Sequence, residues 1–149
     1  MKALSIKAPW AYLIVNGFPV LHPVPVGDGT AVRLDWDGKT VVVKDIENRT
    51  WPLPPSFALP QRVAVHVGLR DDHDALEALM EIGVPPAHAL MAFSKRLPRG
   101  AIIGEVDIVA CVTKSASPWF AGPYGFVLRN PSSYKEPVPC KGRLGFFEV

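Results

Sequence analysis

The sequence has little of what would narrow its function at once. Its two cysteines, Cys111 and Cys140, stand far apart, without CxxC spacing or a nearby histidine cluster, so neither a zinc site nor a disulfide framework is indicated. No run of about twenty apolar residues occurs. We therefore expect a soluble, cytoplasmic protein with reduced thiols, no membrane contact, no metal site and no cofactor.

Charge is also scarce and nearly balanced. The chain carries 16 Lys and Arg against 14 Asp and Glu, a net charge of +2. This excess is too small to indicate a nucleic-acid partner by itself, so any basic patch must be local. The length of 149 residues fits a single domain, and 48% hydrophobic with 20% charged residues is typical of a globular chain.

The chain does contain short alternating and helical patterns. Residues 3–7 alternate in polarity like a half-buried strand, and apolar residues at helical spacing after Pro9 predict a helix over residues 9–16. Further strands are expected at 63–67, 101–112, 126–129 and 144–149, and further helices at 71–80 and 87–93. Because helices are inserted between six or so strands without regular alternation, we expect an α+β fold, a small mixed β-barrel or strongly bent sheet with short flanking helices.

A hairpin is predicted ahead of the most polar stretch. Residues 31–36 and 39–43 flank Asp37-Gly38, a dipeptide typical of two-residue hairpin turns. Such a loop predicts the cross-strand pairs Trp36–Lys39, Leu34–Val41 and Val32–Val43.

Residues 44–51, Lys-Asp-Ile-Glu-Asn-Arg-Thr-Trp, crowd acid, base, amide, hydroxyl and indole groups together. If this stretch is extended, one side carries the alternate residues Asp45, Glu47, Arg49 and Trp51. The Glu47 carboxylate and the Arg49 guanidinium can hold each other in position, either to shape a cleft or to serve catalysis. Lys44 falls on the opposite face, so a site shared with Glu47 requires a bulge or turn at residues 45–46.

Several segments, in their order along the chain, resemble the ASCH domain family. They are Ala3-Leu4-Ser5-Ile6-Lys7-Ala8-Pro9-Trp10-Ala11, Gly17, residues 44–51, Val65-His66, Gly100-Ala101-Ile102-Ile103-Gly104 and Lys141-Gly142-Arg143-Leu144-Gly145-Phe146-Phe147. The resemblance covers nearly the whole chain and implies one domain over residues 1–149 with a PUA-like β-barrel. In that family the glycine after the first helix stands close to a Lys-x-x-Glu-x-Arg stretch, so residues 18–43 look inserted.

The resemblance also implies a cleft beside the barrel, lined by Lys44, Glu47 and Arg49, that handles RNA or modified nucleosides. Some family members are ribonucleases, and a small relative is an amidohydrolase that deacylates a modified cytidine. In that relative a lysine matches Lys44, but a threonine stands where this chain has Glu47. This chain therefore keeps the lysine of that relative but lacks the hydroxyl of its threonine.

The candidate site residues follow from these patterns. Lys44 and Glu47 are the candidate catalytic residues, and His66, on the polar face of its strand, is a further candidate acid or base or a structural histidine. Candidate ligand-binding residues are Lys7, Arg49, Trp51, Trp119 and Tyr124. Other basic residues that can meet phosphate are Arg62, Lys95, Arg96, Arg99, Lys141 and Arg143.

Three functions stay open at this point. An RNA- or nucleotide-binding module needs only the aromatic and basic groups, and we rank it first. A metal-independent hydrolase acting on RNA or a modified nucleoside needs Lys44 and Glu47 in one pocket. A protein-interaction domain would use the inserted hairpin.

Overall fold

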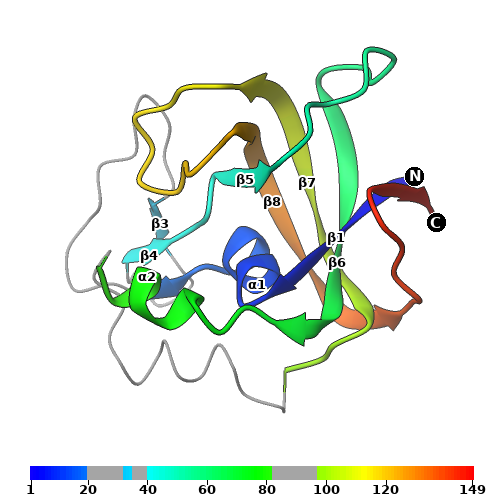
Figure 1. Cartoon of the computed structure of the whole chain (residues 1–149). Helices are drawn as coiled ribbons and strands as arrows, with labels where there is room; N and C mark the ends of the chain where they lie inside the picture. The colour runs from blue at the N-terminus through cyan, green and yellow to red at the C-terminus, as the bar shows by residue number, and fades with distance from the viewer. Residues whose placement is uncertain (20–31, 35–39, 82–96) are drawn as a thin grey trace.

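The structure, a computed structural model, describes residues 1–19, 32–34, 40–81 and 97–149 (Figure 1). Its main sheet has six strands in the order β5-β8-β7-β6-β1-β9. These are β1 (Lys2–Ala8), β5 (Ile46–Arg49), β6 (Gln61–Asp71), β7 (Ala101–Val112), β8 (Tyr124–Pro139) and β9 (Phe146–Glu148). Two short helices, α1 (Trp10–Val15) and α2 (Ala75–Glu81), accompany the sheet, so the expected α+β class is confirmed.

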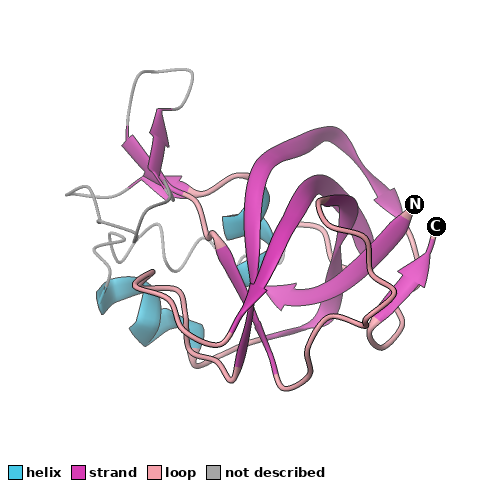
Figure 2. Cartoon of the chain, turned by 90° about the horizontal axis from the view of Figure 1, so that it is seen from above, coloured by secondary structure: helices cyan, strands magenta, loops and turns pink. Residues whose placement is uncertain are grey.

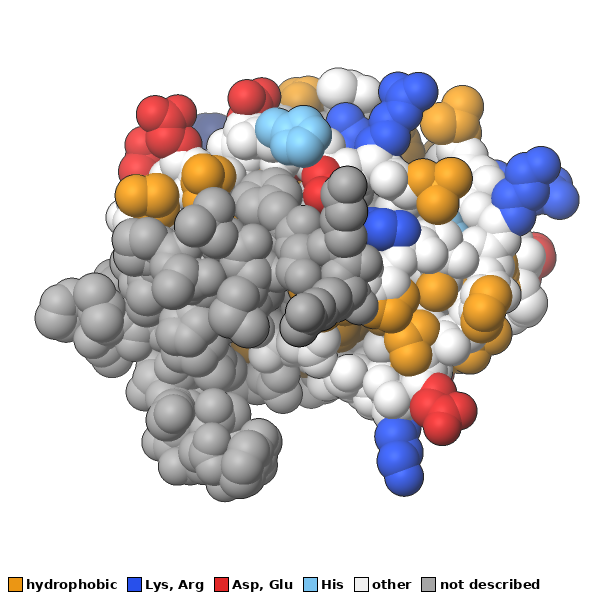
Figure 3. Space-filling model, turned by 90° about the horizontal axis from the view of Figure 1, so that it is seen from below, with side chains coloured by type: hydrophobic (Ala, Val, Ile, Leu, Met, Phe, Trp, Pro, Cys, Tyr) orange, Lys and Arg blue, Asp and Glu red, His pale blue; other side chains and the backbone are white. Residues whose placement is uncertain are grey.

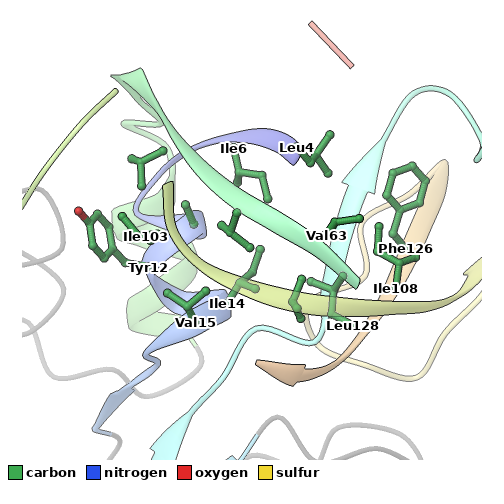
Figure 4. Close-up of a cluster of buried hydrophobic side chains, with 14 of the residues drawn as sticks. Leu4, Ile6, Tyr12, Ile14, Val15, Val63, Ile103, Ile108, Phe126 and Leu128 are labelled. Carbon is green, nitrogen blue, oxygen red and sulfur yellow. The ribbon is translucent and has the colours of Figure 1, made fainter. Parts of the chain in front are cut away.

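Alternation in β1 and β6 divides the sheet into an apolar face and a mixed face. The two strands run parallel, and Leu4 and Ile6 join the valines of β6 in the main core, against which α1 packs (Figure 4). On the opposite face Ala3 and Ala64 pack with Ile102 and Phe147. The predicted helix is confirmed, and Gly17, at φ +68°, ends it in the left-handed region that favours glycine.

The sheet is strongly bent but is not closed into the barrel that we expected (Figure 2). β5 and β9 are its two edges and do not pair with each other. Aromatic side chains bridge the two edges instead: the Trp51 ring, just after β5, lies 5.8 Å from the Phe146 ring of β9 and 5.5 Å from that of Phe126. Edge-to-face ring contacts therefore occupy the gap that backbone hydrogen bonds would close in a barrel.

A second, three-stranded sheet lies between α1 and β5 along the chain. β2 (Phe18–Pro19), β4 (Thr40–Val42) and β3 (Val32–Leu34) form it in the order β2-β4-β3. The observed pairs, Val32–Val42, Arg33–Val41 and Leu34–Thr40, are one residue out of the predicted register. Across a two-residue loop, the numbers of paired residues add up to an odd number, as in the predicted pair Trp36–Lys39. The numbers of the observed pairs add up to an even number, so the predicted register is wrong. The turn residues, 35–39, lie outside the described residues.

β8 is far longer than the predicted strand at 126–129. Its later part contains Pro131, Pro137 and Pro139, which hid the strand from sequence reasoning. β5 pairs only with Tyr124–Val127, so these prolines lie on a stretch where β8 has no partner on the β5 side and a missing N–H costs little. The β7–β8 register shifts at Gly104, where a Cβ would collide with the Ser132 carbonyl oxygen.

The second helix begins later than predicted. β6 continues to Asp71, and the Asp72 carboxylate accepts from the Asp74 N–H in a turn that precedes α2. Leu79 is buried, but Met80, predicted to be buried, is 48% exposed. The predicted helix at 87–93 lies outside the described residues. Among the described helices, none combines the length and apolar character needed to cross a membrane.

Candidate functional site

A large cavity lies beside the C-terminal half of β1. Its volume is about 1200 Å³, and its lining comes mainly from β1, the start of α1, β5, the end of β6 and loop residues 140–145. Small-molecule pockets usually measure roughly 300–1,000 Å³, so this cavity has room for a nucleotide or a short stretch of single strand.

Lys44 and Glu47 share this cavity, because the regular strand begins only at Ile46 and strand alternation does not place the two on opposite faces. Lys44 precedes β5, and its N–H donates to the Leu13 carbonyl of α1 at 3.0 Å. The Lys44 Nζ donates to the Ile46 carbonyl and, at 3.2 Å, to Glu47 Oε2. Both side chains are buried and line the cavity, so the two candidate catalytic residues do meet in one pocket.

Burial dominates the electrostatics of Lys44. Loss of hydration lowers the pKa of its ammonium, the nearby Glu47 carboxylate opposes this, and the Arg49 charge adds to the lowering. The Trp10 ring lies 5.7 Å from Nζ and offers a cation–π contact. Lys44 is therefore a lysine whose neutral amine forms more readily than that of an exposed one.

Asp45 does not join this group, contrary to the predicted alternation. Its carboxylate accepts from Ser117 Oγ at 2.6 Å, away from the cavity lining. Burial raises the pKa of Asp45, and the Ser117 hydrogen bond opposes the rise. The reason is that β5 begins at Ile46, so strand alternation does not extend back to residue 45.

Arg49 lies between the motif and β1. Its Nη2 donates to the Ser5 carbonyl at 2.9 Å, and its guanidinium carbon lies 5.7 Å from the Trp51 ring centre. Its Nε is 3.7 Å from Glu47 Oε1 and is buried without a hydrogen-bond partner among the described residues. The expected Glu47–Arg49 pair exists, but one donor of the guanidinium is buried beside Glu47 without a hydrogen bond in the described part of the chain.

His66 is buried on the mixed face of β6 and also lines the cavity. Its Nδ1 lies 2.9 Å from Ser5 Oγ, and its Nε2 lies 2.7 Å from the Cys140 carbonyl oxygen. Sequence reasoning named His66 but missed Ser5, since the Ser5–His66 register of two parallel strands sixty-one residues apart leaves no sequence signal.

The predicted aromatic residues divide into two groups. Trp51 lines the cavity, whereas Trp119 and Tyr124 do not. Trp119 is 6% exposed and packs edge-on against Trp10, with ring centres 6.1 Å apart. Trp10, which was not among the candidate residues, also lines the cavity and donates from Nε1 to Asp72 Oδ2 at 2.8 Å.

Basic side chains also gather at the cavity, and several Lys and Arg side chains lie close together among hydrophobic ones on the face drawn in Figure 3. The basic lining residues are Lys7, Lys44, Arg49, Arg70, Lys141 and Arg143, and the acidic ones are Glu47 and Asp72. Arg62 and Arg99 form ion pairs elsewhere, and Lys95 and Arg96 lie outside the described residues. The described lining thus has six basic side chains against two acidic ones, an excess of four on a chain whose net charge is +2.

No group of three or more His, Cys, Asp or Glu side chains with a metal-binding arrangement is found in the described part of the chain. A scan of protein-family models gives no match for this sequence, and a search of curated proteins gives no matching relative.

Proposed function

We propose that this chain is an ASCH-type domain with a PUA-like fold, and that its cavity binds single-stranded RNA or a nucleotide. The observation that carries this proposal is the concentration of positive charge: six basic side chains and two acidic ones line a single cavity. Phosphate is the ligand group that such a site attracts, because each added cation lowers the free energy of a polyanion held there.

The lining also supplies flat apolar surface for bases. Trp10 and Trp51 are both half-buried side chains of the cavity, and the Arg49 guanidinium lies over the Trp51 ring. Stacking of a base on such a group contributes about 1 to 3 kcal/mol and tolerates any base. Charge and stacking together favour a single strand over a duplex, whose bases are already stacked.

Binding is tested by fluorescence anisotropy with a labelled single-stranded oligouridylate over a salt series. Lys141→Gln and Arg143→Gln should each lower the affinity about fivefold and reduce the salt dependence of log K by about 0.7. The matched control is Lys135→Gln, which removes an exposed charge of β8 outside the lining and should change neither. Equal losses in all three variants, or no binding at low salt, would refute the proposal.

A second candidate function is a hydrolase that acts on RNA or a modified nucleoside, and the desolvated Lys44 beside Glu47 favours it specifically. An ammonium at this position can stabilise a developing oxyanion, and a neutral amine can serve as base or nucleophile while Glu47 positions it or moves a proton. Because burial lowers the pKa of Lys44, the neutral form is populated at lower pH than in an exposed lysine.

This candidate is tested by following RNA cleavage and deacylation of acylated nucleosides in the presence of EDTA. If the neutral amine acts, the rate should rise with pH below the ordinary lysine value of 10.5. Lys44→Met keeps the stem and removes the charge, so turnover should be lost while ligand binding falls much less. Full activity of Lys44→Met would exclude the scheme.

A further inference from the structure

A second reactive arrangement lies in the same cavity, built from residues that the Lys44 scheme does not use. Ser5 Oγ and His66 Nδ1 are 2.9 Å apart, and His66 Nε2 and the Cys140 carbonyl oxygen are 2.7 Å apart. Ser5 and His66 face each other because they are register partners on the parallel strands β1 and β6. The loop that follows β8 brings the Cys140 carbonyl to the far side of the ring.

The carbonyl assigns the tautomer of the imidazole. A carbonyl oxygen can only accept, so Nε2 must carry the proton and donate to it. In the neutral ring Nδ1 then has a lone pair, and the Ser5 hydroxyl must donate to Nδ1. The order is therefore hydroxyl, base and orienting acceptor, which is the order that activates a serine nucleophile.

Ser5 is partly exposed on the cavity side, whereas His66 is buried behind it. Both residues line the cavity, together with Gly68 and Gly142. A Cβ on Gly142 would lie 2.6 Å from the His66 ring and 3.1 Å from Ser5 Oγ, so at this position any side chain would crowd both groups. Arg49, whose Nη2 contacts the Ser5 carbonyl, brings a guanidinium with an unpartnered buried Nε to the same strand.

We propose that Ser5 is a nucleophile for acyl transfer, with His66 as its general base and the Cys140 carbonyl as the group that orients His66. The substrate class is a carboxylic ester that carries phosphate, because the surrounding lining is cationic. That substrate class rests on the proposed function, whereas the serine chemistry rests on the hydrogen bonds alone.

The reaction has two balanced halves. Ser5 Oγ forms a bond to the acyl carbon while its proton passes to His66 Nδ1, and the ester C–O bond then breaks as the departing alkoxide takes that proton. A water next attacks the acyl-serine, giving its proton to His66, and the released Ser5 oxygen recovers it. The products are an alcohol and a carboxylic acid, and no oxidant or further reactant is needed.

The first test treats the full chain with a fluorophosphonate probe, in which Ser5 Oγ forms a bond to phosphorus and fluoride leaves. Intact mass followed by peptide mapping should place a single adduct on Ser5. Ester turnover is measured with an O-acetylated uridine monophosphate and with the same ester lacking phosphate. The phosphorylated ester should have a kcat/KM about tenfold higher, the effect of one charged hydrogen bond.

Variants then separate chemistry from structure. Ser5→Ala should abolish labelling and turnover, and His66→Gln should lower kcat about a hundredfold or more, while circular dichroism shows that both remain folded. Ser133→Ala, at an exposed serine of β8, is the matched control and should keep full activity. Labelling of the wild type at another residue, no ester turnover by the wild type, or full turnover by Ser5→Ala each overturns the proposal.

Oligouridylate binding by Ser5→Ala is measured alongside, and it should stay within about twofold of the wild type because the basic lining is intact. If the wild type binds RNA but Ser5 is unreactive, only the acyl-transfer proposal fails. If Ser5 is reactive but the protein neither binds RNA nor prefers the phosphorylated ester over the unphosphorylated one, the proposed binding function fails. The assignment of a phosphate-bearing substrate then fails as well, and the serine chemistry stands.

Discussion

Two clusters of acids and bases stand on the same sheet, and they differ in how completely they are hydrogen-bonded. The motif cluster consists of Lys44, Glu47 and Arg49, and the Arg62 cluster consists of Arg62, Glu105 and Asp107 with Tyr134 and Asn130. In the Arg62 cluster both ion pairs measure 2.9 Å, and every carboxylate oxygen has a partner. In the motif cluster Glu47 Oε1 has only Arg49 Nε at 3.7 Å, and that nitrogen has no described hydrogen-bond partner.

The difference separates a fully paired ion network from the incompletely paired cluster at the proposed binding site. Both clusters set an arginine beside a carboxylate, but the Arg62 cluster lies outside the cavity and all four of its carboxylate oxygens are paired. The motif cluster is more buried, lines the cavity and retains an unpaired donor. An incompletely hydrogen-bonded buried network costs stability.

The largest expected effect is on stability when each cluster loses its central carboxylate. Glu47→Ala leaves the Lys44 ammonium buried without its counter-charge and should lower the free energy of unfolding by about 3 kcal/mol. Glu105→Ala, in a cluster whose side chains are partly exposed, should cost about 1 kcal/mol. Urea unfolding followed by circular dichroism measures both, and similar losses would contradict the comparison.

A smaller effect is expected on ligand binding. Arg49→Gln should weaken oligouridylate binding about tenfold, because it removes a positive charge from the cavity lining. Arg62→Gln makes the same charge change in the satisfied cluster and should alter the affinity by less than about twofold. Anisotropy titration at fixed salt compares them, and a larger loss for Arg62→Gln would place the ligand elsewhere.

The smallest effect concerns acid stability. Hydrogen bonds from Asn130 and Arg62 hold the pKa of Asp107 below its ordinary value of 3.8. The stabilisation is therefore present above that value and is lost as pH falls through the lowered pKa, since the unfolded chain then binds the proton first. In Arg62→Gln, the free energy of unfolding lost on acidification should be smaller by about 0.5 kcal/mol. Unfolding midpoints below pH 5 measure it, and an unchanged slope would show that Asn130 alone sets the pKa.

The sequence predicted the cavity residues that lie close together along the chain, but not those that distant strands bring together. Lys44, Glu47, Arg49 and Trp51 were named from one dense stretch, and all four line the cavity. Trp119 was a candidate ligand-binding residue but does not line the cavity, whereas Trp10 was not a candidate and does. Whether Trp10 or Trp119 reaches the cavity depends on how α1 packs against the loop before β8.

The sequence by itself determined the local structure and the identity of the reactive groups. Alternation in residues 3–7 and 63–67 predicted β1 and the middle of β6, and helical spacing predicted α1, because the periodicity of a side chain's direction is a local property. The α+β class followed from the order of these elements. Of β8, only residues 126–129 were predicted. The prolines that follow are tolerated because that part of β8 has no partner on the β5 side, and no local sequence pattern reveals this.

Only the tertiary structure decided which groups meet. It leaves the bent sheet open, with an aromatic contact between Trp51 and β9, and it starts β5 only at Ile46, so that Lys44 reaches Glu47. It also sets Ser5 beside His66 and Cys140 beyond it. These juxtapositions join residues up to 135 positions apart, as for Ser5 and Cys140, and depend on strand register and loop path, which arise from the packing of the whole core.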